Sequence, residues 1–500
     1  MIITELQQLY ATHPNVEGMC KLLKDNSVRH LYCSGLCASA ASLFSSVLVQ
    51  RAECPFVFIL GDLEEAGYFY HDLTQILGTG QVLFFPSSFR RAIKYGQKDA
   101  ANEILRTEVL SRLQKGEEGF CVVTYPDALA EKVVSRKELG DKTLKLHAGE
   151  KVDMDFVTEV LRSYGFEYVD YVYEPGQYAV RGSIIDVFSF SSEFPFRIDF
   201  FGDEVESIRT FEVESQLSKE KKEEIVIVPD LSRSLEQGGN GGMVSFLDFL
   251  RPDTLLAMRD FLWLRERIQV VHDESLTAQA IAACEAEENG AISLEGKLID
   301  GGEFTLRALD FRRMEFGTKP TGTPDATVAF STVAQPIFHK NFDLVAESFR
   351  DYLSRNYTLY ICSDSLKQTD RIRAIFEDRG DNISFTPVER TLHEGFADDT
   401  LRLCIFTDHQ LFDRFHKYNL KSDKARSGKV ALSLKELNQF TPGDYVVHTD
   451  HGVGRFTGLV RVPNGDTTQE VMRLVYQNDD VVFVSIHSLH KVSKYKGKEG

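Results

Sequence analysis

The sequence lacks the features of an exported or membrane-anchored protein. It holds no apolar run long enough to cross a membrane, and its first residues, MIITELQQLYATHP, lack the basic start and apolar core of a secretory leader. Cysteine is scarce, with eight in 500 residues, and no two of them form a CxxC pair or a Cys/His zinc spacing. We therefore expect a cytoplasmic protein with reduced thiols, no membrane contact and no metal site.

Positive charge is also in short supply. The chain carries 57 lysines and arginines against 75 aspartates and glutamates, a formal net charge of -18. The last sixty residues hold seven basic and seven acidic side chains, so the whole acidic excess lies in residues 1–440. Because such a surface repels a phosphate backbone, it disfavours broad nucleic-acid binding and favours proteins as partners.

What is present is an alternation of short apolar strands and helices. In residues 1–145, the segments HLYCSG, PFVFILGD and GFCVVTYP are each followed by a helical pattern. This alternation predicts a parallel sheet flanked by helices. Five hundred residues exceed one ordinary core, so we expect several domains.

One of these strand-helix junctions, SGLCASAASLF, is placed like a phosphate-binding loop. A working loop has the pattern GxxxxGK[ST], in which backbone amides hold phosphate, the lysine neutralises its charge and the hydroxyl holds magnesium. Gly35 and Ser42 fit this pattern, but Ala40 and Ala41 stand in place of the glycine and the lysine. We expect a strand, turn and helix without a nucleotide, because the only cation of the loop is missing.

A long signature lies in residues 174–218, EPGQYAVRGSIIDVFSFSSEFPFRIDFFGDEVESIRTFEVESQLS. It contains RGxxxDxF, then RxxFFxDExxSxRxF, then SQ, and it resembles the damage-recognition module shared by UvrB and the transcription-repair coupling factors. UvrB has an intact phosphate loop and the coupling factors have a degenerate one, so Ala40 and Ala41 favour the coupling-factor family. The short segment RRAIKYGQ, which stands where UvrB carries a long aromatic hairpin that enters DNA, favours it too.

Within this signature, the strand PFRIDFFGD predicts two faces. The period of two places Phe196, Ile198 and Phe200 in the core and Arg197 and Phe201 on the other face. An exposed aromatic flanked by an arginine is typical of an interface anchor. From the residues alone, the alternative is favoured, in which Phe201 tucks under a loop and Arg197 pairs with Asp199 or Glu204. The resemblance implies instead that Arg181, Arg197 and Phe201 bind UvrA.

The C-terminal segment predicts a small β module. FTPGDYVVHTDHGVGRFTGLVRV, EVMRLVYQ and DVVFVSIHSL alternate like strands, and Asn464-Gly465 suits a hairpin turn. This module resembles the RNA-polymerase-interacting domain of the coupling factors, which is related to CarD-type regulators. The resemblance implies that an edge strand pairs with the polymerase β subunit. We expect EVMRLVYQ to be that strand, with Met472 or Leu474 as the apolar contact.

The resemblance implies a multidomain α/β fold. The expected domains are a RecA-like parallel sheet with a degenerate phosphate loop (1–145 and 218–316), an inserted α+β, UvrA-binding domain (146–217), a second small α/β domain (327–420) and an SH3-like, CarD-type barrel (435–497). Residues 327–420 show no glycine fingerprint and no converging acid and base, so we expect a connector or spacer there.

The function implied by the resemblance is that of an adaptor, which links RNA polymerase stalled at a DNA lesion to UvrA. In the family, two further motor domains bind ATP, magnesium and DNA and displace the polymerase. The sequence ends at KYKGKEG, just past the barrel, so we expect the N-terminal part of such a protein, with no catalytic residue and no cofactor of its own. Two other functions stay open: a UvrB-like, damage-verifying ATPase, and a CarD-type regulator that acts through the barrel alone.

Overall fold

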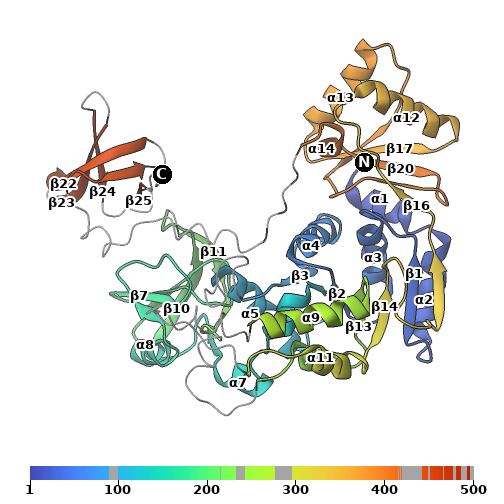
Figure 1. The fold of residues 1–500 in the computed structure, drawn as a ribbon. Coiled ribbons are helices and arrows are strands. Elements are labelled where there is room, and N and C mark those ends of the chain that lie inside the picture. The colour runs from blue at the N-terminus through green and yellow to red at the C-terminus, as the bar shows by residue number, and fades with distance from the viewer. Residues whose placement is uncertain are drawn as a thin grey trace. The chain divides into compact units, whose positions relative to one another are not determined.

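The computed structural model describes residues 1–88, 100–213, 215–231, 243–275, 296–414, 416, 418, 420, 442–448, 451–464, 467–476, 480–485 and 492–495. The chain divides into two compact units (Figure 1). The first comprises Met1–Lys98, Val109–Arg136 and Asn240–Leu420, and the second comprises Asp99–Glu108, Lys137–Gly239 and Lys421–Gly500.

The first unit is built on a seven-stranded parallel sheet with the strand order β15-β1-β14-β13-β2-β4-β3. Strands β2, β3, β4 and β13 are buried along their whole length, as in a parallel sheet that helices cover on both faces. The sheet comprises β1 (His30–Ser34), β2 (Phe56–Ile59), β3 (Val82–Phe85), β4 (Cys121–Thr124), β13 (Leu255–Met258), β14 (Arg312–Glu315) and β15 (Ala326–Ala329).

The chain leaves this sheet after β4 and returns to it with β13 and β14, which lie between β1 and β2. The helices around it are α1 (Ile3–Tyr10), α2 (Pro14–Lys24), α3 (Ala40–Arg51), α4 (Leu63–Leu77), α6 (Pro126–Ala130), α9 (Phe261–Ser275), α11 (Gly301–Ala308) and the 3-10 turn η2 (Phe246–Phe249). Helix α5 (Ala100–Gln114) and helix α7 (Arg136–Asp141) carry the chain from one unit to the other. The predicted mixed α/β fold with a parallel sheet is confirmed.

Local sequence explains how helix α4 begins. The carboxylate of Asp62 accepts hydrogen bonds from the backbone amides of Glu64 and Glu65, and both glutamates lie in the first turn, where the helix dipole favours negative charge. Helix α3 begins differently, because its capping residue Ser39 makes no side-chain hydrogen bond to its own helix.

A second sheet in the same unit has five strands in the order β16-β19-β20-β17-β18 and mixes parallel and antiparallel pairs. Its elements are β16 (Thr332–Ala334), α12 (Phe342–Ser354), β17 (Thr358–Ser363), α13 (Leu366–Asp378), β18 (Thr386–Glu389), β19 (Phe396–Asp398), β20 (Leu403–Thr407) and α14 (Asp408–Leu411). The N-terminus of the chain is tied to it, since the amino group of Met1 donates to the carbonyl of Pro387 over 3.2 Å (Figure 1).

The second unit contains a six-stranded sheet in the order β11-β10-β9-β8-β7-β6, antiparallel except for the pair β6 and β7. Strands β5 and β12 form a separate pair. The elements are β5 (Leu144–His147), α8 (Met154–Ser163), β6 (Glu167–Tyr168), β7 (Gln177–Arg181), β8 (Ile184–Val187), β9 (Phe196–Phe201), β10 (Glu204–Phe211), β11 (Ser218–Lys222) and β12 (Glu224–Ile227).

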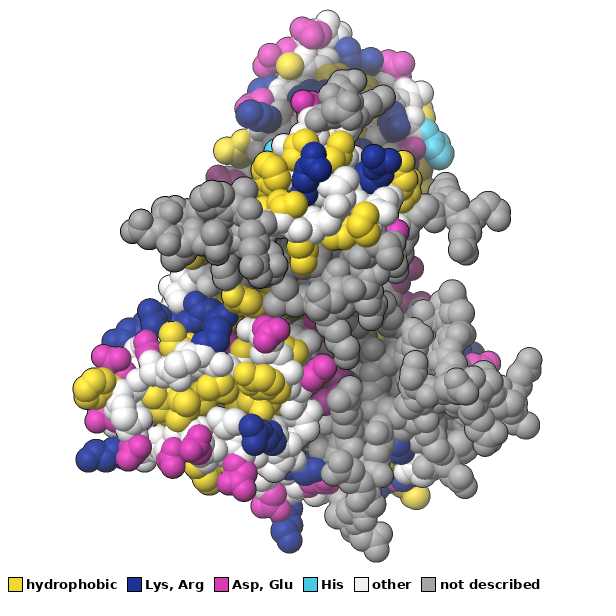
Figure 2. Space-filling model, turned by 90° about the vertical axis from the view of Figure 1, so that its left-hand side faces the viewer, with side chains coloured by type: hydrophobic (Ala, Val, Ile, Leu, Met, Phe, Trp, Pro, Cys, Tyr) yellow, Lys and Arg dark blue, Asp and Glu magenta, His cyan; other side chains and the backbone are white. Residues whose placement is uncertain are grey.

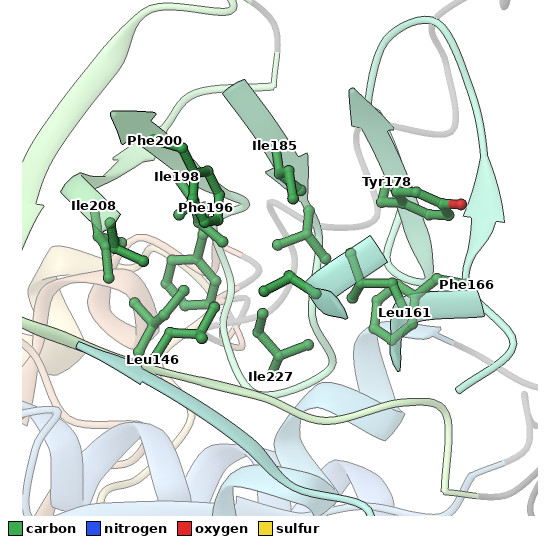
Figure 3. Packing of buried hydrophobic residues seen from close by; sticks show 14 residues of the cluster. Leu146, Leu161, Phe166, Tyr178, Ile185, Phe196, Ile198, Phe200, Ile208 and Ile227 are labelled. Atoms are coloured by element: carbon green, nitrogen blue, oxygen red, sulfur yellow. The ribbon is translucent and has the colours of Figure 1, made fainter. Parts of the chain in front are cut away.

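The core of this unit lies between one face of the six-stranded sheet and α8, β5 and β12 (Figure 3). Phe196, Ile198 and Phe200 of β9 all point into it, which confirms the face predicted from the period of two. Each buried side chain of this size stabilises the fold by roughly 1.5–3 kcal/mol. The opposite face of β9 is thereby turned away from the core.

The C-terminal segment forms an antiparallel sheet of five strands in the order β24-β23-β22-β21-β25, called here the C-terminal sheet. It comprises β21 (Tyr445–His448), β22 (Gly452–Asn464), β23 (Thr467–Val475), β24 (Val481–Ser485) and β25 (Val492–Lys494). The pairing of β22 with β23 shifts register between Phe456 and Gly458, and Gly458 there adopts a φ of 126°, which favours glycine.

Among the described residues, no helix combines the length and the apolar character that a membrane crossing requires.

Candidate functional site

The hairpin between β9 and β10 presents Phe201 to solvent. Phe201 pairs with Glu204 across a tight turn, in which Gly202 adopts a φ of 62°. The side chain of Phe201 follows the buried Phe200 on the strand and is therefore on the face turned away from the core; the residue is 80% exposed. The alternative in which Phe201 tucks under a loop is wrong.

A buried carboxylate lies on the same face of the sheet. Asp186 of β8 stands directly opposite Arg197 of β9, and its two oxygens accept from Nε and Nη2 of Arg197 at 2.8 and 2.9 Å. Arg181 of β7 donates to the same carboxylate. The Asp186 side chain is 1% exposed, whereas those of Arg181 and Arg197 are 35% and 15% exposed. One aspartate therefore fixes both arginines.

Each of the two guanidinium groups also lies over an aromatic ring. Arg197 lies 4.5 Å from the ring centroid of Phe211, and Arg181 lies 4.9 Å from that of Tyr171. The hydrogen bond to Asp186 raises the pKa of Arg197 above its usual value. Arg197 is therefore a permanently charged, rigid group. Because its side chain is mostly buried, a partner protein can contact only the exposed edge of the guanidinium group.

Sequence reasoning missed Asp186 as the partner of Arg197. The alternatives of Asp199 and Glu204 are wrong: Asp199 instead accepts from the Ser183 hydroxyl at 3.1 Å and lies 3.5 Å from Arg209. A signal was available, because Asp186 is the aspartate of the RGxxxDxF motif. Its role follows only from the strand register, which places it beside Arg197.

Arg181, Arg197 and Phe201 thus share one face of the sheet, which we call the hairpin face. Arg197 and Phe201 are four residues apart on one strand, a separation of about 13 Å. An exposed aromatic ring near charges held in place suits a protein interface, because little side-chain freedom is lost on binding. Figure 2 shows, on one side of the molecule, apolar side chains gathered in patches bordered by charged ones of both signs.

The degenerate phosphate loop takes the predicted form of strand, turn and helix. Gly35 follows β1 with a φ of 76°, and Ala40 and Ala41 open helix α3, where both are buried. The Ser42 hydroxyl donates to Asp72 of α4 at 2.7 Å. Burial raises the pKa of Asp72 to about 6, although hydrogen bonds from neighbouring groups oppose this rise. A serine that would hold magnesium in a working loop serves here as a donor to protein.

The strand and side chains expected to contact polymerase lie in the interior of the C-terminal sheet. Strand β23 pairs with β22 on one side and with β24 on the other, so the expectation that EVMRLVYQ forms an edge strand is wrong. Met472 and Leu474 are completely buried in the core of the C-terminal sheet. A partner does not reach their side chains from outside, and their contact with polymerase stays a prediction.

The same sheet does carry exposed apolar groups on β24. Phe483 is 52% exposed, and Val481 is also exposed. Within the part of the chain that the structure describes, no three histidine, cysteine, aspartate or glutamate side chains are arranged to hold a metal ion.

Comparison with known proteins places both surfaces in recognised domains. Residues 144–232 match the model of the UvrB interaction domain, and residues 440–496 match that of the CarD-like/TRCF RID domain. The hairpin face lies in the first match and the C-terminal sheet in the second.

Most of the chain is similar to curated transcription-repair-coupling factors. It is 23% identical to the one from Bacillus subtilis strain 168 over 538 residues, and 23% identical to the one from Staphylococcus aureus strain bovine RF122 / ET3-1 over 541 residues. Each alignment covers 93% of this chain but only 45% of the relative, so the chain spans about half the length of the proteins it matches.

The buried carboxylate leads to a stability prediction. Replacing Arg197 by alanine leaves the charge of Asp186 buried with one partner, and breaking such a pair costs about 3 kcal/mol. We expect roughly hundredfold faster hydrogen exchange across β8 and β9 in Arg197→Ala. The control Arg209→Ala removes a more exposed pair with Asp199 and should change exchange less than threefold. Equal exchange in both variants would contradict the role given to Asp186.

Proposed function

We propose that this chain is the adaptor part of a transcription-repair coupling factor, which joins RNA polymerase stalled at a DNA lesion to UvrA. The observation that carries the proposal is the presence in one chain of a UvrB interaction domain and a CarD-like/TRCF RID domain. The first supplies a surface for UvrA and the second a surface for polymerase.

The hairpin face supports the UvrA half of the proposal. Phe201 is the anchor, since burying an exposed aromatic ring is among the largest single gains at a protein interface. Arg181 offers the more accessible charge, and Arg197 acts mainly at its exposed edge. Asp186 is a positioning residue, because it is buried and acts through the two arginines.

The C-terminal sheet supports the polymerase half. A strand of the polymerase β subunit adds to an edge of this sheet, and within the described residues β24 pairs only with β23. We favour β24 over the other edge strand, β25, because it carries the exposed Phe483 and Val481. An exposed apolar edge is an aggregation risk unless a partner covers it.

We also propose that the seven-stranded parallel sheet is RecA-like and that the C-terminal sheet is an SH3-like barrel. The second candidate function is a UvrB-like ATPase. Ala40 and Ala41 weigh against it, because the loop lacks the lysine that would neutralise the charge of a bound phosphate. In the longer coupling factors, ATP, magnesium and DNA are proposed to be handled by motor domains. We therefore expect no saturable binding of a fluorescent ATP analogue by this chain.

The UvrA contact can be tested with matched phenylalanines. Phe201→Ala should weaken capture of purified UvrA about thirtyfold, the loss typical of a central interface anchor. Phe156→Ala is the control, because Phe156 is also exposed but lies on α8, which packs against the opposite face of the sheet. Unchanged capture by Phe201→Ala, with the wild type binding, would remove Phe201 from the interface.

The polymerase contact can be mapped by hydrogen exchange. Addition of the purified β subunit should slow exchange across 481–485, because a strand added at the edge bonds the free backbone groups of β24. Phe483→Ala should weaken this binding about tenfold, whereas Tyr495→Ala, exposed beside β25, should leave it unchanged. Slowed exchange at 492–494 alone would assign the contact to β25 instead.

A further inference from the structure

Backbone amides of the degenerate phosphate loop are already bonded to protein. The amide of Cys37 donates to the hydroxyl of Thr332 at 3.1 Å, and the amide of Ser39 donates to the carbonyl of Glu394 at 3.4 Å. In a working loop these groups point at phosphate. Here their acceptors come from the segment that carries the second sheet of the same unit.

The bonds also run in the opposite direction. The amide of Glu394 donates to the Ser39 hydroxyl at 2.9 Å, and the amide of His393 donates to the carboxylate of Asp72 at 2.7 Å. The other oxygen of Asp72 accepts from Ser42. Asp72 is therefore the common acceptor that joins the start of α3, helix α4 and residues 391–395, which we call the plug loop.

Gly35 also lies in close contact with another part of the chain. A Cβ atom at this position would lie 2.0 Å from the carbonyl oxygen of Phe330, far inside any real contact. The hydroxyl of Thr332 donates to the carbonyl of Gly35 at 2.6 Å. The glycine that begins the phosphate-loop pattern is thus required here by the close approach of the chain after β15.

Further contacts are made by the plug loop and by the residues on either side of it. The rings of Tyr68 on α4 and His393 stack with centroids 3.5 Å apart. Tyr10 of α1 donates to Asp398 at 2.9 Å, and Glu389 donates its amide to the carbonyl of Met1 at 2.9 Å. These contacts join the two sheets of the first unit at several points.

The space left beside the loop does not suit a polyphosphate. It is a cavity of about 590 Å³, and its lining includes the carboxylates of Asp62, Glu64, Glu65, Asp72 and Glu394. The two arginines that line it are each paired, Arg259 with Glu65 and Arg414 with Asp408. Like charges so close together oppose the entry of an anion.

We propose that the plug loop is an internal ligand of the degenerate phosphate site, and that the 327–420 domain locks the first sheet in place of a nucleotide. This domain is then a functional part of the fold rather than a spacer. If the plug loop fixes the phosphate loop, a change that increases hydrogen exchange in the plug loop also increases it in the phosphate loop. A domain that is only a spacer would not couple the two segments.

The test is hydrogen exchange on the whole chain, comparing Asp72→Ala with Asp72→Asn. Asp72→Ala removes the common acceptor and should speed exchange at least tenfold in both 36–42 and 391–396. Asp72→Asn keeps an oxygen for the amide of His393 and gains a donor for the Ser42 hydroxyl, so exchange should stay within about threefold of the wild type. Protection across β2 and β13 checks that Asp72→Ala remains folded.

Three results would overturn the proposal. One is faster exchange in 391–396 of Asp72→Ala while 36–42 keeps its wild-type rate, because the two segments would then be independent. Another is wild-type exchange in both segments of Asp72→Ala. The third is magnesium-dependent binding of a fluorescent ATP analogue by the variant Ala40→Gly with Ala41→Lys, since the plug loop should still fill the restored site.

Discussion

The rest of the structure depends on a simple constraint: a backbone amide donates to one strong acceptor at a time. At the degenerate phosphate loop, the amides of Cys37 and Ser39 donate to Thr332 and Glu394. The cation that a nucleotide needs is absent at Ala41, and the donors that would hold its phosphates are engaged. These bonds tie the loop to the segment that carries the second sheet of the first unit.

The proposed function rests on two exposed surfaces. The hairpin face and β24 share a physical pattern, in which an exposed phenylalanine projects from a strand whose alternate side chains pack in a core. A buried aspartate holds the two arginines that share a face with Phe201, so this part of the surface is ordered before a partner arrives. This preorganisation is what distinguishes a docking surface from a merely exposed ring.

Features set by local periodicity could be predicted from the sequence. The faces of β9 follow from alternation, and the loss of Lys from the phosphate loop is read directly from Ala41. Features set by strand order or long-range contact could not. The pairing of Asp186 with Arg197 depends on the register of β8 and β9, and the interior position of β23 depends on the order of strands in its sheet. The plug loop is bonded to residues more than 300 positions away in the sequence.

The proposed adaptor role requires the chain to bind UvrA and polymerase at the same time. The most direct measurement is sedimentation of the chain with purified UvrA and the polymerase β subunit, separately and then together. We expect two binary complexes and one faster species that contains all three proteins. Mutually exclusive binding, in which the β subunit displaces UvrA, would contradict the proposed adaptor role.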